Sequence, residues 1–288
     1  MPNAVEPPSA SPQGLDEALT LLASGGPPWR PLAGGTDLMV QLTGELGEPP
    51  ERILDIWALD ELRGIAHEGD GLVIGALTTY AEIRRSPVVT ELLPALAEAA
   101  ATIGAAQIQN RGTLGGNVVN ASPAGDTLPL LLATDAEMIL GSTSGVRTVA
   151  AADFWSAYRT TARRDDELLL RIRIRLTPAR QVRFRKIGTR RAQAISKVVM
   201  ALSWRVENGG LWREVRLALG SVAATTIRVP VTEAALEGAS PTRETMAAAG
   251  EALAAEIQPI DDVRSTADYR RAVAVRALHR LIRDEGDW

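Results

Sequence analysis

Two glycine-rich stretches hold the residue types in this 288-residue chain that are best suited to binding a ligand. The longer stretch, RGTLGGNVVNASPAGD (Arg111–Asp126), has three glycines within five residues, then two asparagines, a serine and an aspartate. Glycine lets the backbone take a positive φ and approach a ligand closely. Exposed backbone N–H groups and short polar side chains suit a phosphate or the polar edge of a flat cofactor. The alternative is a tight turn between two strands.

The shorter stretch, PLAGGTDLMV (Pro31–Val40), places Gly34 and Gly35 directly before Thr36 and Asp37. The last two are favoured helix N-cap residues, and N–H groups exposed at such a turn form an anion site. Neither stretch matches the G-x-G-x-x-G or the G-x-x-x-x-G-K-[ST] fingerprint, so neither is specific on its own. Together this first glycine loop and the longer, second glycine loop indicate an extended ligand with a phosphate end and a polar aromatic end.

The composition excludes several kinds of reactive centre. Cysteine is absent, so the chain forms no disulfide and holds no thiolate metal site or iron–sulfur cluster. The two histidines, His67 and His279, have no partner set for a metal site or a Ser-His-Asp triad. We therefore predict no catalytic residue and no metal ligand. Redox chemistry would require a bound cofactor, and any metals would lie in another chain.

Charge and hydropathy exclude further classes. The net charge of −4 gives no reason to expect binding to nucleic acid or to a membrane surface. No apolar run reaches the roughly 18–20 residues that span a bilayer. Residues 1–14 lack the basic and apolar regions of a secretory signal, so a cytoplasmic location is predicted. Lys186 and Lys197 are the only lysines. The other basic residues are arginines, and an ammonium differs from a guanidinium in reach and hydration. The lysine at position 186 therefore either has a specific role or occurs there by chance.

Apolar periodicity and turn residues predict the elements around the two loops. In the first half, helices are expected at residues 14–24, 78–86, 92–104 and 126–133, strands at 29–33 and 52–59, and hairpins at 62–76 and 137–150. Asp126 stands where it could cap the helix that follows it, and capping and ligand binding can coexist in one loop.

The segment ELLLRIRIRL (Glu167–Leu176) alternates arginine with apolar residues, which predicts a strand with one basic and one apolar face. The basic face either is solvated or docks on an acidic partner. After Pro178 we expect strands at residues 182–189 and 211–229 and helices at 231–236, 243–256 and 268–283. Residues 194–207 fit either a strand or a helix.

These elements predict an α+β fold. Two α/β subdomains, about residues 1–55 and 56–178, are followed at residues 179–288 by a C-terminal antiparallel sheet with helices.

Four motifs in this order resemble the FAD-binding (medium) subunit of the molybdenum hydroxylases, the xanthine dehydrogenase and carbon monoxide dehydrogenase relatives. They are AGGTDL, IGALTTYAEI, GTLGGNVVNASPAGDTLPLLLATDA and FRKIGTRRAQAISKV. The resemblance runs from about Pro31 to Leu278, and YRTTARRDDELL (Tyr158–Leu169) is more similar to the xanthine dehydrogenase branch. It implies a PCMH-type FAD-binding fold of two subdomains with a C-terminal domain.

The resemblance also implies FAD as the cofactor and a set of residues that bind it. Ala33–Asp37 would hold the pyrophosphate, largely through backbone N–H groups, while Leu169 and Lys186 would lie near the flavin. Ile103 matches a position that is aromatic in some relatives, so ring-on-ring stacking is not expected there. The full set of expected FAD-binding residues is Leu32, Ala33, Gly34, Gly35, Thr36, Asp37, Leu38, Ile103, Thr113, Gly115, Gly116, Asn117, Ser122, Asp126, Leu169 and Lys186.

The function implied is that of an electron-transfer oxidoreductase subunit in a heterotrimer. A molybdopterin large subunit would hydroxylate the substrate, and an iron–sulfur small subunit would pass electrons to FAD on this chain. NAD or another acceptor would then receive them. Two alternatives remain open: a stand-alone FAD-dependent oxidoreductase of the same fold, and a non-enzymatic nucleotide-binding subunit.

Overall fold

The computed structural model describes residues 7–43, 48–190, 193–286 and 288. Outside these ranges lie residues 1–6, which belong to the segment that lacks the features of a secretory signal. Two residues of the FRKIGTRRAQAISKV motif also lie outside them. Within them, no helix is both long and apolar enough to cross a membrane.

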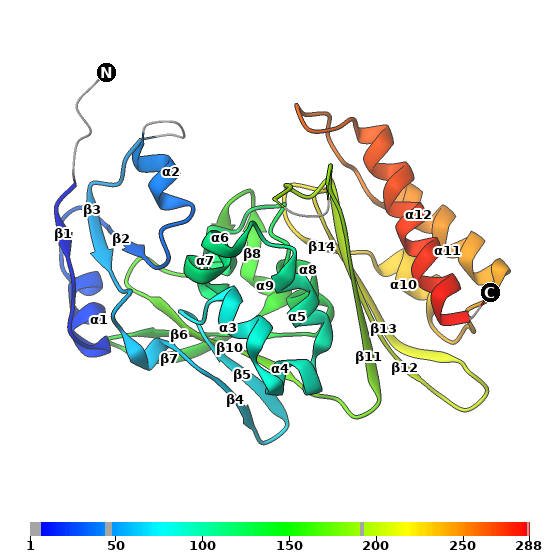
Figure 1. The fold of residues 1–288 in the computed structure, drawn as a ribbon, viewed down its shortest axis with the longest axis horizontal. Coiled ribbons are helices and arrows are strands. Elements are labelled where there is room, and N and C mark those ends of the chain that lie inside the picture. Colours follow the sequence, from blue (N-terminus) through cyan, green and yellow to red (C-terminus); the bar gives the residue numbers. More distant parts are fainter. Residues whose placement is uncertain (1–6, 44–47, 191–192, 287) are drawn as a thin grey trace.

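Two main sheets lie within the first 178 residues (Figure 1). A small parallel sheet contains β1 (Ser9–Ala10), β3 (Arg52–Asp55) and β2 (Trp29–Leu32), with α1 (Leu15–Ala23) connecting β1 to β2. An antiparallel sheet follows, in the order β4 (Ile65–Glu68), β5 (Gly71–Gly75), β10 (Leu168–Arg175), β6 (Glu137–Ser142) and β7 (Gly145–Ala150). Each sheet has its own apolar core, one including Leu54 and Leu59, the other Ile74 and Ile172.

The third main sheet is antiparallel and lies at the opposite end of the molecule (Figure 1). Its strands are β11 (Arg180–Ile187), β12 (Val198–Val206), β13 (Trp212–Gly220) and β14 (Ile227–Arg228). Helices α10 (Pro230–Leu236), α11 (Arg243–Glu256) and α12 (Ala267–Gly286) cover one of its faces. Segment 194–207, which fitted either a strand or a helix, is mainly the strand β12. Its sequence lacks an amphipathic period because both faces of the strand are buried: Val199 belongs to one core and Val198 to another.

Six short helices fill the space between the antiparallel sheets (Figure 1). They are α3 (Tyr80–Arg85), α4 (Pro87–Leu92), α5 (Pro94–Ala101), α6 (Ala106–Arg111), α7 (Leu114–Asn120) and α8 (Leu128–Ala133). Local sequence sets where they begin. Thr79 and Glu82 form a reciprocal capping box at α3, and proline occupies the first position of α4 and α5.

The remaining short elements flank the first loop and connect the sheets. They are α2 (Leu38–Leu42), the 3₁₀ turn η1 (Asp60–Leu62), α9 (Ala151–Phe154) and the small ribbon of β8 (Trp155–Ala157) and β9 (Thr160–Thr161).

Part of the second glycine loop is a helix, not a turn between strands. Leu114–Asn120 form α7, and a Cβ at Gly115 would lie 2.6 Å from the carbonyl oxygen of Ala76. Gly115 is therefore required for close packing of a helix on the end of β5. The expected helix at 92–104 ends earlier, at Ala101, and the expected strand at 52–59 stops at Asp55.

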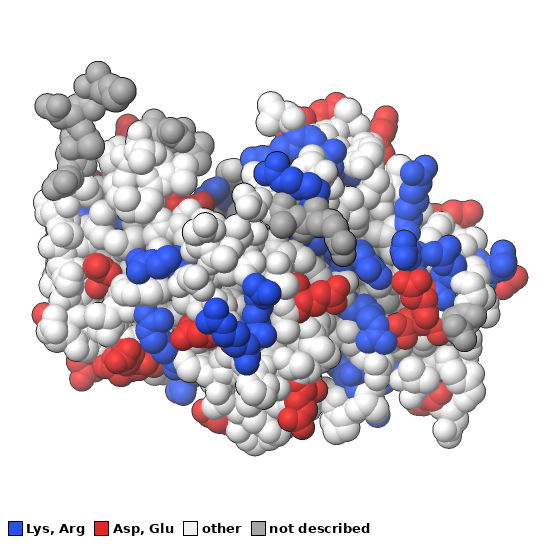
Figure 2. Space-filling view, in the orientation of Figure 1, with Lys and Arg blue, Asp and Glu red and all other residues white. Residues whose placement is uncertain are grey.

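The basic face of β10 pairs largely with the chain's own carboxylates. Arg173 contacts Asp70 and Glu137, and Arg175 lies 3.5 Å from Asp70. Basic and acidic side chains are also interspersed over the molecular face in Figure 2. The pairing of Arg173 and Arg175 with the chain's own carboxylates favours the solvated alternative for this strand.

A buried arginine fixes the start of α12. Arg270 donates to the carbonyl oxygen of Ser221 (2.9 Å) and to the carboxylate of Asp262 (2.5 Å). Burial alone would raise the pKa of Asp262, but the hydrogen bonds from Arg270 and from backbone N–H groups lower it to about 2.

We therefore expect Asp262→Asn to lower the free energy of unfolding by roughly 1–2 kcal/mol at pH 7. A depressed folded-state pKa stabilises the protein above the ordinary pKa, and that stabilisation is lost as the pH falls from about 4 toward 2. Urea unfolding at pH 7, 4 and 3 should thus show the difference from the parent shrinking. Asp268→Asn, an exposed carboxylate of α12, is the control. A difference that stays constant with pH would contradict this assignment.

Candidate functional site

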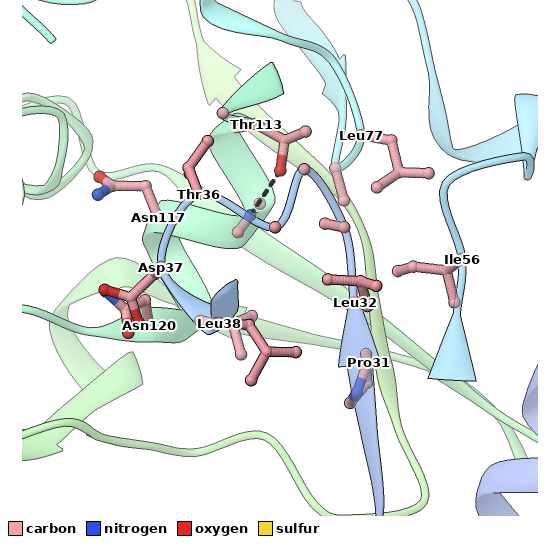
Figure 3. Close-up of a pocket in the computed structure, with 18 of the residues that line it drawn as sticks. Pro31, Leu32, Thr36, Asp37, Leu38, Ile56, Leu77, Thr113, Asn117 and Asn120 are labelled. Atoms are coloured by element: carbon pink, nitrogen blue, oxygen red, sulfur yellow. Dashed lines mark hydrogen bonds between the residues drawn. The ribbon is translucent and has the colours of Figure 1, made fainter. Parts of the chain in front are cut away.

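A cleft of about 270 Å³ lies between the first glycine loop and α7 (Figure 3). Of the expected FAD-binding residues, those that line it are Leu32, Ala33, Gly34, Gly35, Thr36, Asp37, Leu38, Ile103, Thr113, Gly115, Gly116, Asn117 and Leu169. Figure 3 shows Asp37 and Asn120 together on one side and the apolar Ile56 and Leu77 on the other. The cleft is therefore polar along one wall and apolar along the other.

The two glycines of the first loop are needed for different reasons. Gly35 has φ +77°, a left-handed conformation that other residues adopt only with strain. Gly34 is pressed against the second loop: a Cβ there would lie 1.7 Å from the carbonyl oxygen of Arg111. One glycine makes the turn, and the other lets two parts of the chain that are far apart in sequence come into backbone contact.

The hydrogen bonds of the first loop leave its N–H groups free. The carbonyl of Gly35 accepts from Met39 N (2.9 Å), and that of Asp37 accepts from Val40 N (3.1 Å). The four N–H groups of Gly34–Asp37, in contrast, have no partner among the residues that the structure describes. Consecutive unpaired N–H groups at the rim of a cleft form an anion site.

Capping does not account for Thr36 or Asp37. Asp37 occupies the N-cap position of α2, but its side chain makes no capping hydrogen bond. The Asp37 carboxylate instead accepts from Gln41 Nε2 (3.3 Å) and lies 3.6 Å from Arg159 Nη1. That same Nη1 donates to Asn120 Oδ1 (2.7 Å), so Arg159 connects the first loop to the end of α7.

The N-terminus of α7, unlike the first loop, is already satisfied. Leu114 N donates to Thr78 O (3.0 Å), Gly115 N to Ala76 O (2.9 Å) and Gly116 N to the capping hydroxyl of Thr113 (3.0 Å). The second glycine loop therefore offers side chains rather than an anion site. Its Asn117 accepts at Oδ1 from the Thr127 hydroxyl (2.8 Å), which leaves the amide NH₂ as the part able to contact a ligand.

Three expected residues, Ser122, Asp126 and Lys186, do not line the cleft. Lys186 of β11 forms a buried ion pair with Asp126 (Nζ–Oδ2, 2.5 Å) and donates to Thr102 O (3.0 Å), beside Ile103 of the cleft wall. Asp126 also accepts from Ser196. The capping hypothesis for Asp126 was wrong, because α8 begins after Thr127 and has no side-chain cap. Burial raises the pKa of Asp126, and the Lys186 charge opposes this.

Sequence analysis missed several residues of the cleft. Tyr80 lines it, and its buried hydroxyl has no hydrogen-bond partner among the described residues. Burial raises the pKa of Tyr80, so the phenol stays protonated. Arg30 and Arg163 line the cleft as well. Tyr80 and Arg163 lie inside motifs that carry the resemblance, but nothing in their type or spacing marked them as ligand contacts.

Comparison with known proteins decides the family. The model for the FAD-binding domain in molybdopterin dehydrogenase matches residues 5–176, and the model for the carbon monoxide dehydrogenase flavoprotein C-terminal domain matches residues 183–284. The chain belongs to the FAD-binding subunits of the molybdenum hydroxylases. FAD is its cofactor, and it is a subunit of an oxidoreductase complex.

Its relatives come from both branches of this family. The carbon monoxide dehydrogenase medium chain of Hydrogenophaga pseudoflava is 35% identical over 277 residues, which cover 94% of each chain. The xanthine dehydrogenase FAD-binding subunit of Escherichia coli O157:H7 is 33% identical over 259 residues, covering 89% of this chain and 88% of the other. These similar identities do not single out the xanthine dehydrogenase branch that Tyr158–Leu169 indicates.

Solved structures share the same fold. The carbon monoxide dehydrogenase structure of Hydrogenophaga pseudoflava superposes with a TM-score of 0.90 at 33% identity, covering 95% of each chain. The quinoline 2-oxidoreductase structure of Pseudomonas putida 86 also gives 0.90, at 27% identity, covering 98% of this chain and 97% of the other. The α+β fold expected from the sequence, a mixture of helices and strands, is confirmed.

The residues of the cleft fit FAD. The unpaired N–H groups of Gly34–Asp37 suit its pyrophosphate, and the apolar lining residues, Ile103 and Leu169 among them, suit a flat ring. Tyr80 supplies a buried hydroxyl that still lacks a partner. Within the described residues, no cluster of three or more His, Cys, Asp or Glu side chains forms a metal site.

The Lys186–Asp126 pair joins β11 to the wall of the cleft. Lys186→Met would leave a buried carboxylate unpaired, so we expect it to cost about 3–5 kcal/mol of unfolding free energy. Adding Asp126→Asn should restore part of that loss, since the unpaired charge is then removed. Urea unfolding of the two single variants and the double variant measures the coupling.

Lys197→Met is the matched control, because the only other lysine is half-buried beside Tyr269. Its loss should stay near 1 kcal/mol or below. If Lys186→Met were no more costly than Lys197→Met, the ion pair would not be holding the two parts together.

Proposed function

We propose that this subunit takes electrons from a partner iron–sulfur subunit and passes them through FAD to NAD or another acceptor. A molybdopterin large subunit would hydroxylate the substrate, and the three chains would form a heterotrimer in the cytoplasm. Support comes from the relatives, which are medium chains and FAD-binding subunits of carbon monoxide, xanthine and nicotinate dehydrogenases. A xanthine dehydrogenase-like activity stays a prediction based on Tyr158–Leu169.

The observation that carries the assignment of the site is the row of unpaired N–H groups at Gly34–Asp37. We propose that they bind the FAD pyrophosphate, with Thr36 adding a hydroxyl. Asn117 would donate its amide to the ribityl or ribose hydroxyls, and Ile103 and Leu169 would pack on a ring. The isoalloxazine supplies the redox chemistry when FAD is bound, while the protein supplies binding, orientation and exclusion of water.

The three expected residues that do not line the cleft, Ser122, Asp126 and Lys186, are proposed to support the cleft wall without touching FAD. Lys186 and Asp126 form a buried ion pair, and Lys186 would hold the Thr102–Ile103 segment in place through its hydrogen bond to the Thr102 carbonyl. Ser122 accepts from Ala124 N (3.3 Å) and shapes the turn that leads to Asp126. We also propose that the FAD-binding part and the C-terminal part divide near residue 178, between β10 and β11.

FAD titration of two alanine variants tests the phosphate site. Gly35→Ala and Gly69→Ala both place an L-residue at positive φ (+77° and +61°), so both should lose some stability. Only Gly35→Ala should weaken FAD binding, by tenfold or more, because its strain realigns the N–H groups of the loop. Gly69, in the β4–β5 turn with no atom near a new Cβ, is the control. Unchanged FAD affinity in folded Gly35→Ala would place the pyrophosphate elsewhere.

Purification from the native host tests the proposed partners. The relatives' names indicate multi-chain enzymes, and this chain has no cysteine to hold a cluster. A Cys-rich iron–sulfur chain and a large molybdopterin chain should therefore purify together with it. The complex, but not this chain alone, should hydroxylate a substrate. Hydroxylase activity from the isolated chain would refute the proposed division of labour.

A further inference from the structure

Arg111 lies behind the first glycine loop and does not line the cleft. Its Nε donates to the carbonyl oxygen of Gly34 (3.3 Å), and its guanidinium carbon lies 3.8 Å from the ring centroid of Trp57. A second guanidinium, that of Arg63, lies over the same ring at 4.4 Å and donates to the Trp57 carbonyl. Trp57 and Arg111 thus form a stacked support that reaches the loop from outside.

The hydrogen bond from Arg111 acts on one peptide unit. The carbonyl of Gly34 and the N–H of Gly35 belong to the same planar, trans peptide, so they point in opposite directions. When Arg111 holds the Gly34 oxygen on its side, the Gly35 N–H must point away from Arg111. A peptide between two glycines has little steric resistance to flipping, so an outside contact is needed to fix it.

The other loop carbonyls show the same pattern. Gly35 and Asp37 have their oxygens bonded by N–H groups of α2, while the N–H groups of Gly34–Asp37 stay unpaired. If the Gly34 oxygen were to swing inward, it would place a partial negative charge where a phosphate is expected. Among the described residues, the Gly34 carbonyl is the acceptor that the Arg111 side chain uses, and no carboxylate pairs with its guanidinium.

We propose that Arg111, stacked on Trp57, is a positioning residue that locks the Gly34–Gly35 peptide with its N–H toward the cofactor. The proposal rests on the pyrophosphate site proposed above and adds a residue that does not touch the ligand. Arg111 would act through a hydrogen bond to the loop rather than through its charge on the phosphate.

The test is FAD affinity of Arg111→Ala beside a matched control, Arg52→Ala. Arg52 also lies over a tryptophan ring (Trp29, 4.4 Å) and donates to backbone carbonyls, but it does not touch the first loop. Both variants should lose similar thermal stability. Only Arg111→Ala should bind FAD about tenfold more weakly. Equal FAD affinity in the two variants would overturn the proposal.

Two further readouts separate positioning from charge. Arg111 is exposed, so a direct charge effect on the phosphate would be screened by salt. A positioning effect should give the same fold-change at about 50 mM and about 500 mM salt. The double variant Arg111→Ala/Gly35→Ala should bind FAD no more weakly than Gly35→Ala, because both changes disturb one peptide. A loss that disappears at high salt, or losses that multiply, would overturn the proposal.

These outcomes are distinct from failure of the pyrophosphate site itself. If the site were elsewhere, folded Gly35→Ala would bind FAD as well as the parent chain. If only the role of Arg111 were wrong, Gly35→Ala would still lose affinity while Arg111→Ala kept it.

Discussion

The site depends on a backbone contact between two glycine loops that lie far apart in sequence. Gly34 rests against the carbonyl of Arg111 with no room for a Cβ, and the loop beyond it turns its carbonyls to other partners while its N–H groups stay free. An anion site of this kind has no charged side chain as its main element. Its strength comes from several aligned dipoles, so it exists only while the two loops hold each other in register.

The rest of the molecule can be understood as the support for that contact. Gly115 allows α7 to pack closely on the end of β5, and this packing uses up the N–H groups at the start of the helix. Arg159 connects Asp37 of the first loop to Asn120 of α7 on the polar side of the cleft. At the far wall, Lys186 reaches from β11 to Thr102 and Asp126, so the C-terminal sheet also contributes to the shape of the cleft.

Local patterns in the sequence predicted much of this structure. Glycine pairs, cap residues and apolar periods gave both loops and most helices and strands, because those signals act over a few residues. Local sequence patterns cannot predict the pairing of Lys186 with Asp126, which are 60 positions apart. The same holds for the stacking of Arg111 on Trp57. Gly115 was ambiguous for the same reason: glycine serves both turns and close packing, and only its spatial neighbour, here Ala76, shows which. Segment 194–207 could not be assigned because both faces of β12 are buried.

The most direct measurement follows the backbone amides themselves. In a ¹H–¹⁵N NMR titration of the protein with FAD, the amide resonances of Gly34–Asp37 should shift strongly, because these N–H groups gain charge-assisted hydrogen bonds. Those of Leu114–Gly116 should shift far less, since their partners are already in place. Large shifts at Leu114–Gly116 with little change at Gly34–Asp37 would contradict the account, because the phosphate would then lie on the helix and not on the first loop.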